Sequence, residues 1–354
     1  AGEMIGPAGE RLPAARALKK AGLAPLELDA KEGLALINGM QISCAIGLAA
    51  WARLERCSIT ADLAAALSVE ALLGSHRPFD ARVVGVRPHP GAKRTAANLR
   101  RLLKGSQVAR AHRDCGRVQD PYSFRCVPQV HGAAKDALAH LGAALLCEAN
   151  AVSDNPLVFT TGGGETISAG NFHGQPIALP LDYAANASAT WGNISERRVS
   201  TLIHPAMNAG LPAFLTPKPG LNSGLMIPQV VAAALASENK LLASPASADT
   251  VTTSADQEDH VSMGNHAARK LMTSAENLTR ILAIELLAAA QAREFHRELR
   301  AGVGAEAGYR LLRQNVPPLS DDRYMAPELD RIHALIADGS FVRAAERACG
   351  ALQP

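Results

Sequence analysis

The chain has 354 residues, of which 47% are hydrophobic and 4% aromatic, enough for one large domain or two ordinary ones. Its 36 basic and 33 acidic residues leave a formal charge of +3, which excludes the strongly basic surface of a nucleic-acid-binding protein. No apolar run reaches membrane-spanning length without a charge or a proline, and the first twenty residues lack the apolar segment of a signal peptide. We therefore expect a soluble, cytoplasmic protein.

Alanine and leucine dominate and β-branched runs are rare, which favours helix over most of the chain. We expect helices at 30–55, 60–73, 93–104, 128–151, 176–202, 226–243 and 260–299, with two or three shorter ones after residue 306. Thr60 is predicted to cap the second helix and Gly74 to end it.

The helix that begins at residue 260 is expected to be the longest. Leu271, Ala275, Leu278 and Leu282 follow one another in steps of three and four, which places them on one helix face. Its second half is apolar almost all round, which predicts that it lies inside a bundle or an oligomer interface.

One short β-hairpin is expected at 157–168, because three consecutive glycines from Gly162 supply the positive φ that a tight turn requires. The predicted fold is mostly α: an elongated bundle of long antiparallel helices with polar connecting loops and one short β-hairpin. A single helical domain is expected over 1–354, with the central bundle at about 30–300 and shorter helices at 301–354.

Histidines and cysteines show no metal-binding pattern, because no HxxxH, HxH or CxxC occurs. We expect no metal site, and we expect free, mostly buried thiols in a reducing compartment. The six cysteines are Cys44, Cys57, Cys115, Cys126, Cys147 and Cys349.

Five polar stretches interrupt the alanine-rich and leucine-rich helices, and loops held by rigid helices are where functional sites usually lie. Each stretch also has a plain structural interpretation. Asn38-Gly39 and the DNP at 154–156 are typical of turns, and the acids of DQED at 256–259 suit a helix N-terminus. Arg125 could form a surface ion pair, and Tyr122 could simply pack. The stretches are 31–43, 118–126, 150–159, 168–176 and 254–263.

Taken together, the polar groups suit a small amino acid. An arginine offers a planar fork that matches a carboxylate, and a tyrosine can act as acid or base when its pKa is lowered. Amides orient a substrate, and a glutamate can accept from an N–H of its side chain.

Six stretches, in this order, resemble the motif series of the histidine ammonia-lyases. These belong to the aromatic amino-acid lyases, which use a 4-methylideneimidazole-5-one group (MIO). The resemblance runs from the start of the chain to about residue 270 and is weaker in motif beyond residue 299. The stretches are KEGLALINGMQ, QDPYSFRC, EANAVSDNPLVF, GNFHG, NSGLMIPQVVAAALASENK and DQEDHVSMGNHAARK.

The resemblance implies loss of ammonia from L-histidine to give trans-urocanate, the first step of histidine degradation. The electrophilic MIO takes up electrons from the substrate, a base removes a proton, and polar groups hold the carboxylate. By position, Asn38 and Phe172 resemble residues beside the prosthetic group. Gln119, Tyr122 and Arg125 resemble the trio that lines the site, with Arg125 on the carboxylate. Glu258 resembles the acid near the substrate imidazole.

Two departures from the family pattern stand out. Met40 replaces the usual threonine of Asn-Gly-Thr-Gln, so a hydroxyl beside Asn38 is lost. MIO forms from an Ala-Ser-Gly tripeptide, which these 354 residues do not contain. We expect the sequence to be the part of a longer lyase that follows the electrophile, and to be inactive as a free polypeptide.

Three other interpretations stay open. A tyrosine or phenylalanine ammonia-lyase or aminomutase of the same family is the first, although Glu258 favours histidine because phenylalanine-specific members usually carry an amide there. A fumarase-type lyase would need a GSSxMPxKxN signature, which is not found. A catalytically inactive scaffold is the third, against which the presence of Tyr122, Arg125 and Glu258 argues. The family also implies a homotetramer whose sites take residues from three subunits, and the apolar helix from residue 260 agrees.

Overall fold

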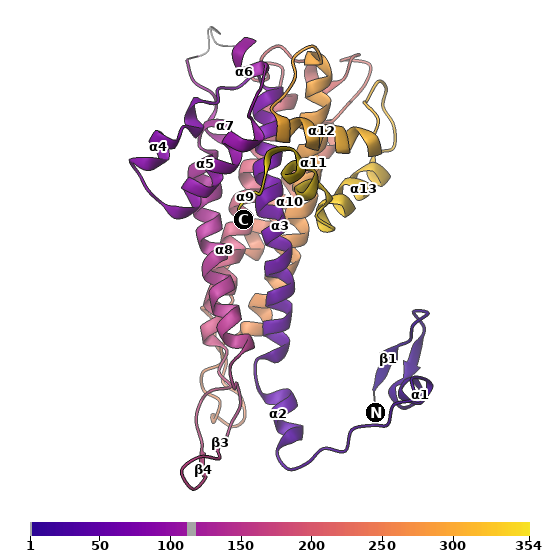
Figure 1. Cartoon of the computed structure of the whole chain (residues 1–354). Coiled ribbons are helices and arrows are strands. Elements are labelled where there is room, and N and C mark those ends of the chain that lie inside the picture. The colour runs from indigo at the N-terminus through magenta and orange to yellow at the C-terminus, as the bar shows by residue number, and fades with distance from the viewer. Residues whose placement is uncertain (1, 112–117) are drawn as a thin grey trace. The chain divides into compact units, whose positions relative to one another are not determined.

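The computed structural model describes residues 2–111 and 118–354, which fall into two compact units. One consists of the residues up to Gly39 together with Val152–Phe172, and the other of Met40–Ala151 together with His173–Pro354. We call them the small unit and the bundle unit. Figure 1 shows the course of the chain in each.

The bundle unit contains most of the helices. Three short 3₁₀ turns lie at Arg77–Phe79, Ala213–Leu215 and Glu294–His296. The helices are α3 (Gln41–Ala71), α4 (Ala81–Gly85), α5 (Pro90–Leu102), α6 (Val108–Ala111), α7 (Tyr122–Arg125), α8 (Val127–Ala149), α9 (Gln175–Ile203), α10 (Met226–Leu242), α11 (Gly264–Arg293), α12 (Val303–Asn315), α13 (Ala326–Ala337) and α14 (Ser340–Cys349).

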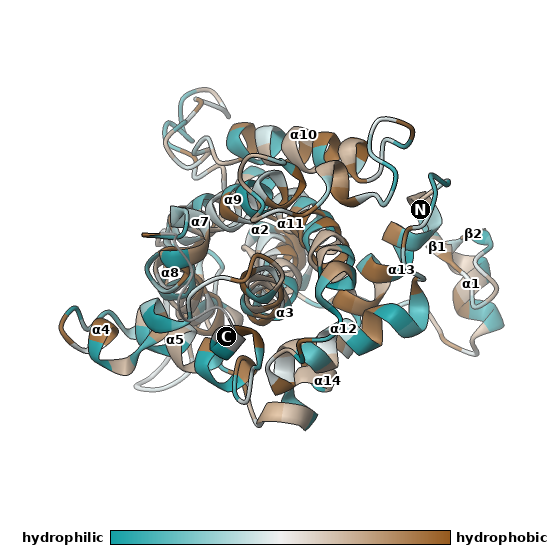
Figure 2. Cartoon of the chain, turned by 90° about the horizontal axis from the view of Figure 1, so that it is seen from above, coloured by the Kyte–Doolittle hydropathy of each residue, from teal (hydrophilic) through white to brown (hydrophobic). Residues whose placement is uncertain are grey.

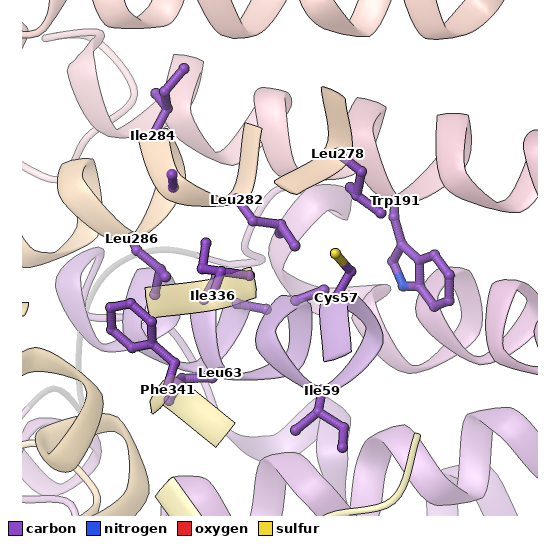
Figure 3. Packing of buried hydrophobic residues seen from close by; sticks show 14 of the residues in the cluster. Cys57, Ile59, Leu63, Trp191, Leu278, Leu282, Ile284, Leu286, Ile336 and Phe341 are labelled. Atoms are coloured by element: carbon purple, nitrogen blue, oxygen red, sulfur yellow. The ribbon is translucent and has the colours of Figure 1, made fainter. Parts of the chain in front are cut away.

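Helix α3 is the centre of the bundle, with α8, α9 and α11 packed along it and α12 and α14 beside it (Figure 2). Every residue from Cys57 to Ala71 is buried. The same holds for Ile281–Arg293 of α11. Figure 3 shows how Leu63 of α3, Leu282 and Leu286 of α11 and Phe341 of α14 meet in the core.

The expected helices at 30–55 and 60–73 are wrong, because one helix, α3, runs unbroken from Gln41 to Ala71. Thr60 lies inside this helix, and its hydroxyl donates to the carbonyl of Arg56, 2.8 Å away. A threonine can satisfy its hydroxyl in this way in mid-helix, so it marks no helix start. Helix α3 has 31 residues and α11 has 30, so α11 is not the longest.

The apolar second half of α11 is buried within this chain. The expectation that the helix from residue 260 supports a homotetramer is therefore wrong, because the rest of this chain covers its apolar surface. The expectation that this segment lies inside a bundle is confirmed.

Two glycines let α5 and α8 cross at close range. A Cβ added at Gly91 would lie 2.0 Å from the carbonyl oxygen of Gly132, and one added at Gly132 would lie 2.3 Å from the nitrogen of Ala92. Any side chain at either position would push the helices apart.

Charged groups in the bundle interior form two joined clusters. Glu285 accepts from Nε and Nη2 of Arg198, at 2.5 and 2.8 Å, and from the hydroxyls of Ser68 and Ser195, at 2.8 and 2.5 Å. Glu285 and Arg198 are both fully buried. Removing one partner of such a pair leaves an uncompensated charge in a medium of low dielectric constant.

Asp62 is the centre of the second cluster. It lies 2.8 Å from Nδ1 of His131, 3.1 Å from Nζ of Lys135 and 2.9 Å from Nδ2 of Asn98. Burial by itself would raise the pKa of this carboxyl, but Lys135, His131 and Asn98 outweigh it and hold the pKa below its ordinary value. Burial lowers the pKa of His131, so its ring is neutral.

The small unit consists of short elements with little buried surface. Its hairpin β1 (Glu3–Ile5) and β2 (Arg11–Pro13) pairs Met4 with Leu12 and was not predicted; α1 (Ala14–Lys20) and α2 (Glu32–Asn38) follow. The expected hairpin is confirmed as β3 (Leu157–Phe159) and β4 (Glu165–Ile167), with Gly162, Gly163 and Gly164 all at positive φ.

Five cysteines are free, as expected, but Cys147 is exposed while Cys126 and Cys349 are only partly buried. Cys115 lies outside the described residues. Within 2–111 and 118–354, no single helix has the length and hydropathy to cross a membrane.

Candidate functional site

The short helix α7 presents the tyrosine and arginine of the QDPYSFRC stretch. It begins directly after Pro121, whose fixed φ suits this position. Phe124 is buried and anchors the turn, whereas the Tyr122 side chain is 70% exposed. The guanidinium carbon of Arg125 lies 4.5 Å from the centre of the Tyr122 ring, so the two polar groups form one cation–π pair.

Two buried charged residues, Arg198 and Glu285, fix the backbone of α7. Nη1 of Arg198 donates to the carbonyl oxygen of Ser123, 3.2 Å away. Because Arg198 is itself fixed by Glu285, the backbone between Tyr122 and Phe124 is tied to the bundle core. Asp120 also fixes the segment before the turn, because its carboxylate accepts from the backbone N–H of Ser75 at 2.7 Å. Gln119 precedes it and is exposed.

Tyr122 borders an open cavity of about 340 Å³ at the C-terminal end of α9. The cavity has both cationic and hydroxyl groups on its wall, so it suits a small polar molecule. Its lining residues are Pro121, Tyr122, Ser123, Arg197, Ser200, Thr201, His204 and Met207.

Glu258 lies in the loop between α10 and α11, far from that turn. Its Oε2 accepts from the hydroxyl of Thr253 at 2.5 Å, and the backbones of the two residues pair across a short antiparallel bridge. Hydrogen bonds from Thr253 and Ser254 lower the pKa of the Glu258 carboxyl. The group is therefore an exposed, ionised acceptor at neutral pH.

The starts of α3, α9 and α11 meet around Met40. A Cβ added at Gly174 would lie 2.2 Å from the Met40 methyl carbon, and one at Gly264 would lie 2.9 Å from it. Met40 thus fills a glycine-lined junction by packing, where a threonine would offer a hydroxyl. Three helix N-termini at one place give this end of the bundle a positive dipole field.

Asn38 and Phe172 both lie in the small unit. Nδ2 of Asn38 is 3.5 Å from Oδ1 of Asp154, whose other oxygen pairs with Lys31. Hydrogen bonding to Lys31 lowers the pKa of Asp154. With its amide N–H directed at Asp154, Asn38 keeps its carbonyl oxygen for another donor. The Phe172 side chain is 37% exposed.

The structure brings some of the predicted residues together and separates others. Tyr122 and Arg125 are in contact, whereas Glu258 lies at the opposite end of α9. From Gln175 to Arg198 the helix rises about 35 Å, at 1.5 Å per residue. One chain therefore cannot close Tyr122 and Glu258 around the same small molecule.

Three residues that hold the predicted groups were missed from the sequence. They are Arg198, Thr253 and Asp154, and each acts by a contact between segments distant in sequence or across a tight bridge. A weak signal existed for Asp154, which lies inside SDNP.

Comparison with known proteins gives consistent results. The model of the family described as "Aromatic amino acid lyase" matches residues 1–314. A histidine ammonia-lyase of Sorangium cellulosum is 52% identical over 348 residues, which cover 97% of this chain and 68% of that protein. The chain spans about two thirds of the length of the curated relatives that it matches.

Solved structures share the fold. The histidine ammonia-lyase of Trypanosoma cruzi has a TM-score of 0.91 and 41% identity, covering 98% of this chain and 66% of that one. A tyrosine aminomutase of Streptomyces globisporus has a TM-score of 0.90 and 36% identity, covering 98% and 69%.

Proposed function

The chain belongs to the aromatic amino acid lyase family, and from this membership we propose that the protein eliminates ammonia from L-histidine to give trans-urocanate. This is the first step of histidine degradation, and we place it in the cytoplasm, where free thiols persist. Relatives named histidine ammonia-lyase, at 46–53% identity over nearly the whole chain, support this activity.

The observation that carries the choice of substrate is the state of Glu258. Its carboxyl has a lowered pKa and is exposed, so it presents a carboxylate that accepts hydrogen bonds. An imidazole ring has an N–H to donate to it, whereas a phenyl ring has none. A charge-assisted hydrogen bond of this kind discriminates histidine from phenylalanine.

The other predicted residues bind and orient the amino acid. Arg125 pairs its guanidinium with the substrate carboxylate, and Tyr122 takes part in proton transfer beside it. Asn38 and Gln119 orient polar groups of the substrate through their amides. Phe172 supplies an aromatic wall.

Enzymes of this family depend on MIO, which forms from an Ala-Ser-Gly tripeptide. The 354 residues contain no such tripeptide, so the group does not arise from them, and the chain's own residues account only for binding, orientation and proton transfer.

We also propose that the working protein is a homotetramer with sites shared between subunits. The separation of Tyr122 from Glu258 along α9 supports this, because a site that uses both must take them from different chains. The small unit supports it as well, because Leu26, Leu36 and Ile37 are at least 60% exposed and apolar surface of this kind is usually covered by a partner.

The activity is tested on the native protein, isolated from its own cells. It is incubated with L-histidine, L-tyrosine or L-phenylalanine, and the near-ultraviolet absorbance of urocanate, coumarate or cinnamate is followed. We expect urocanate alone. Coumarate or cinnamate would favour the rival activity of the same family, and no product from any of the three would favour an inactive scaffold.

The role of Glu258 is tested by Glu258→Gln in the native protein. We expect kcat/KM for L-histidine to fall by about 10- to 100-fold, since a hydrogen bond to a charged group is replaced by a neutral one. Asp256→Asn is the matched control on the same exposed loop, because asparagine tolerates the positive φ of 66° at this position. An equal loss in both variants would argue against a specific role for Glu258.

Sharing of sites is tested by mixing Tyr122→Phe and Glu258→Gln protomers. If one site takes its tyrosine and its glutamate from different chains, mixed assemblies regain part of the activity that each variant lacks. No recovery in verified mixed assemblies would show that each site uses a single chain.

A further inference from the structure

His173 joins the start of α9 to the loop that carries Glu258. It precedes Gly174, the residue that caps α9, and its ring stacks in parallel on the ring of His260, with centres 5.6 Å apart and planes 9° from parallel. Nε2 of His173 lies 3.1 Å from the backbone carbonyl oxygen of His260. His260 follows Glu258 by two residues.

The hydrogen bonds of His173 fix which ring nitrogen carries the proton. Nδ1 accepts from the backbone N–H of Gln175 at 3.4 Å, so it carries no hydrogen. Nε2 faces a carbonyl oxygen, which only accepts, so Nε2 must be the N–H donor. The ring thus receives a hydrogen bond from α9 and donates one to the Glu258 loop.

The loop has a conformation that needs such external support. Ser254, Ala255 and Asp256 have φ of 51°, 56° and 66° in succession. Residues with a Cβ adopt this left-handed region at an energetic cost, and they stay there only when surrounding contacts hold them.

The near half of the loop is already tied to the bundle by other groups. The backbone N–H of Ser247 donates to Asp182 at 2.7 Å, and its carbonyl accepts from Nε2 of Gln175 at 3.1 Å. Lys270 of α11 pairs with the second oxygen of Asp182. After Ser247 the chain turns through the three left-handed residues, and His260 then contacts His173 beside the start of α9.

We propose that His173 is a positioning residue that sets the place of the Glu258 carboxylate by clamping the loop at His260. The contact between His173 and His260 is a property of this chain by itself. Its effect on binding of the substrate imidazole rests on the proposed function. The local bridge between Thr253 and Glu258 shapes the turn, and His173 fixes that turn to the helix.

The clamp is tested first without any activity measurement. In the 354-residue chain, the imidazole ¹⁵N shifts of His173 should show a protonated Nε2 and an unprotonated Nδ1. In His173→Phe, which keeps an aromatic ring for stacking, amide hydrogen exchange of residues 257–261 should quicken about fivefold, the effect of one lost hydrogen bond. His173→Gln keeps a side-chain N–H donor and should restore slow exchange.

A matched control is His204→Phe, at the opposite end of α9, which should leave exchange in 257–261 unchanged. Unchanged exchange in His173→Phe, or the opposite tautomer, would overturn the proposal. A general loss of folding would instead quicken exchange throughout α3 and α11.

Kinetics of the native protein supply the functional readout. We expect His173→Phe to raise KM for L-histidine severalfold with a smaller change in kcat, because the carboxylate that receives the imidazole is misplaced, and we expect His173→Gln to restore KM. If the native protein makes no urocanate, the proposed function fails while the exchange result still decides the clamp. If urocanate forms and KM does not move in His173→Phe, the positioning role fails by itself.

Discussion

The two ends of α9 hold their candidate residues by opposite means. At the C-terminal end, the short helix α7 that carries Tyr122 is hydrogen-bonded to Arg198, whose fully buried guanidinium pairs with Glu285. At the N-terminal end, Glu258 is held by Thr253 and by the clamp from His173, both near the surface. A site residue can thus be fixed by the core of the bundle or by its own loop.

This difference decides which end tolerates change. Polar groups at the buried end are shielded from water. Removing one partner therefore leaves the other unsatisfied and lowers the free energy of unfolding. Groups at the loop end can exchange a lost partner for water, so changes there alter local geometry and pKa with little effect on global stability.

Glu285→Gln should destabilise the chain by about 3–5 kcal/mol, because it leaves the charge of Arg198 buried without a counter-charge. Urea unfolding followed by far-ultraviolet circular dichroism measures this. Asp321→Asn breaks the exposed pair with Lys218 and should leave the urea midpoint almost unchanged. Equal costs for the two variants would erase the contrast between buried and exposed charge.

Gly132→Ala should destabilise the chain by about 1–3 kcal/mol, because the new methyl group meets the backbone of α5. Gly85→Ala, where nothing lies within 4 Å of the added carbon, should be neutral or stabilising by up to about 1 kcal/mol. Thermal unfolding of both variants tests the close crossing of α5 and α8; tolerance of alanine at Gly132 would mean that the helices lie farther apart.

The pH dependence of the free energy of unfolding should reflect the lowered pKa of His131. Burial lowers the pKa of His131, so below about pH 6.5 the unfolded chain takes up a proton that the native ring does not. Stability therefore falls as the pH drops from about 6.5 through the lowered pKa. Asp62 has the same sign at lower pH, since its lowered pKa contributes stability that is lost as the carboxyl is protonated.

In His131→Asn the decline just below pH 6.5 should be shallower, by at most about 1.4 kcal/mol per pH unit. Urea midpoints measured between pH 7 and 5 give both slopes. Identical slopes in the parent chain and the variant would mean that His131 does not carry this proton linkage.

Thr253→Val should leave global stability unchanged and raise the pKa of Glu258 toward its ordinary value, because the largest cause of the lowered pKa is removed. A ¹³C titration of the Glu258 carboxyl measures this, and Thr253→Ser, which keeps the hydroxyl, should retain the lowered pKa. A pKa that stays low in Thr253→Val would place its cause elsewhere in the loop.

The amino-acid sequence determined the fold class and the family. Helix-forming residues in long amphipathic runs predict the bundle, and three glycines predict the hairpin at 157–168, because these patterns act between near neighbours in the chain. The motif series points to the lyase family through residues that are recognisable as written. Helix ends were harder to predict from the sequence. Thr60 is of a residue type that often caps helices, but it lies within the continuous helix α3.

Only the tertiary structure decided which groups lie together. Arg198 and Ser123, or His173 and His260, are far apart in sequence, and no local pattern marks them as partners. The separation of Tyr122 from Glu258 likewise follows from the length and direction of α9, since both residues belong to motifs that the sequence alone would assign to one site. Contacts between distant segments depend on packing in three dimensions, which residue types and spacing do not encode locally.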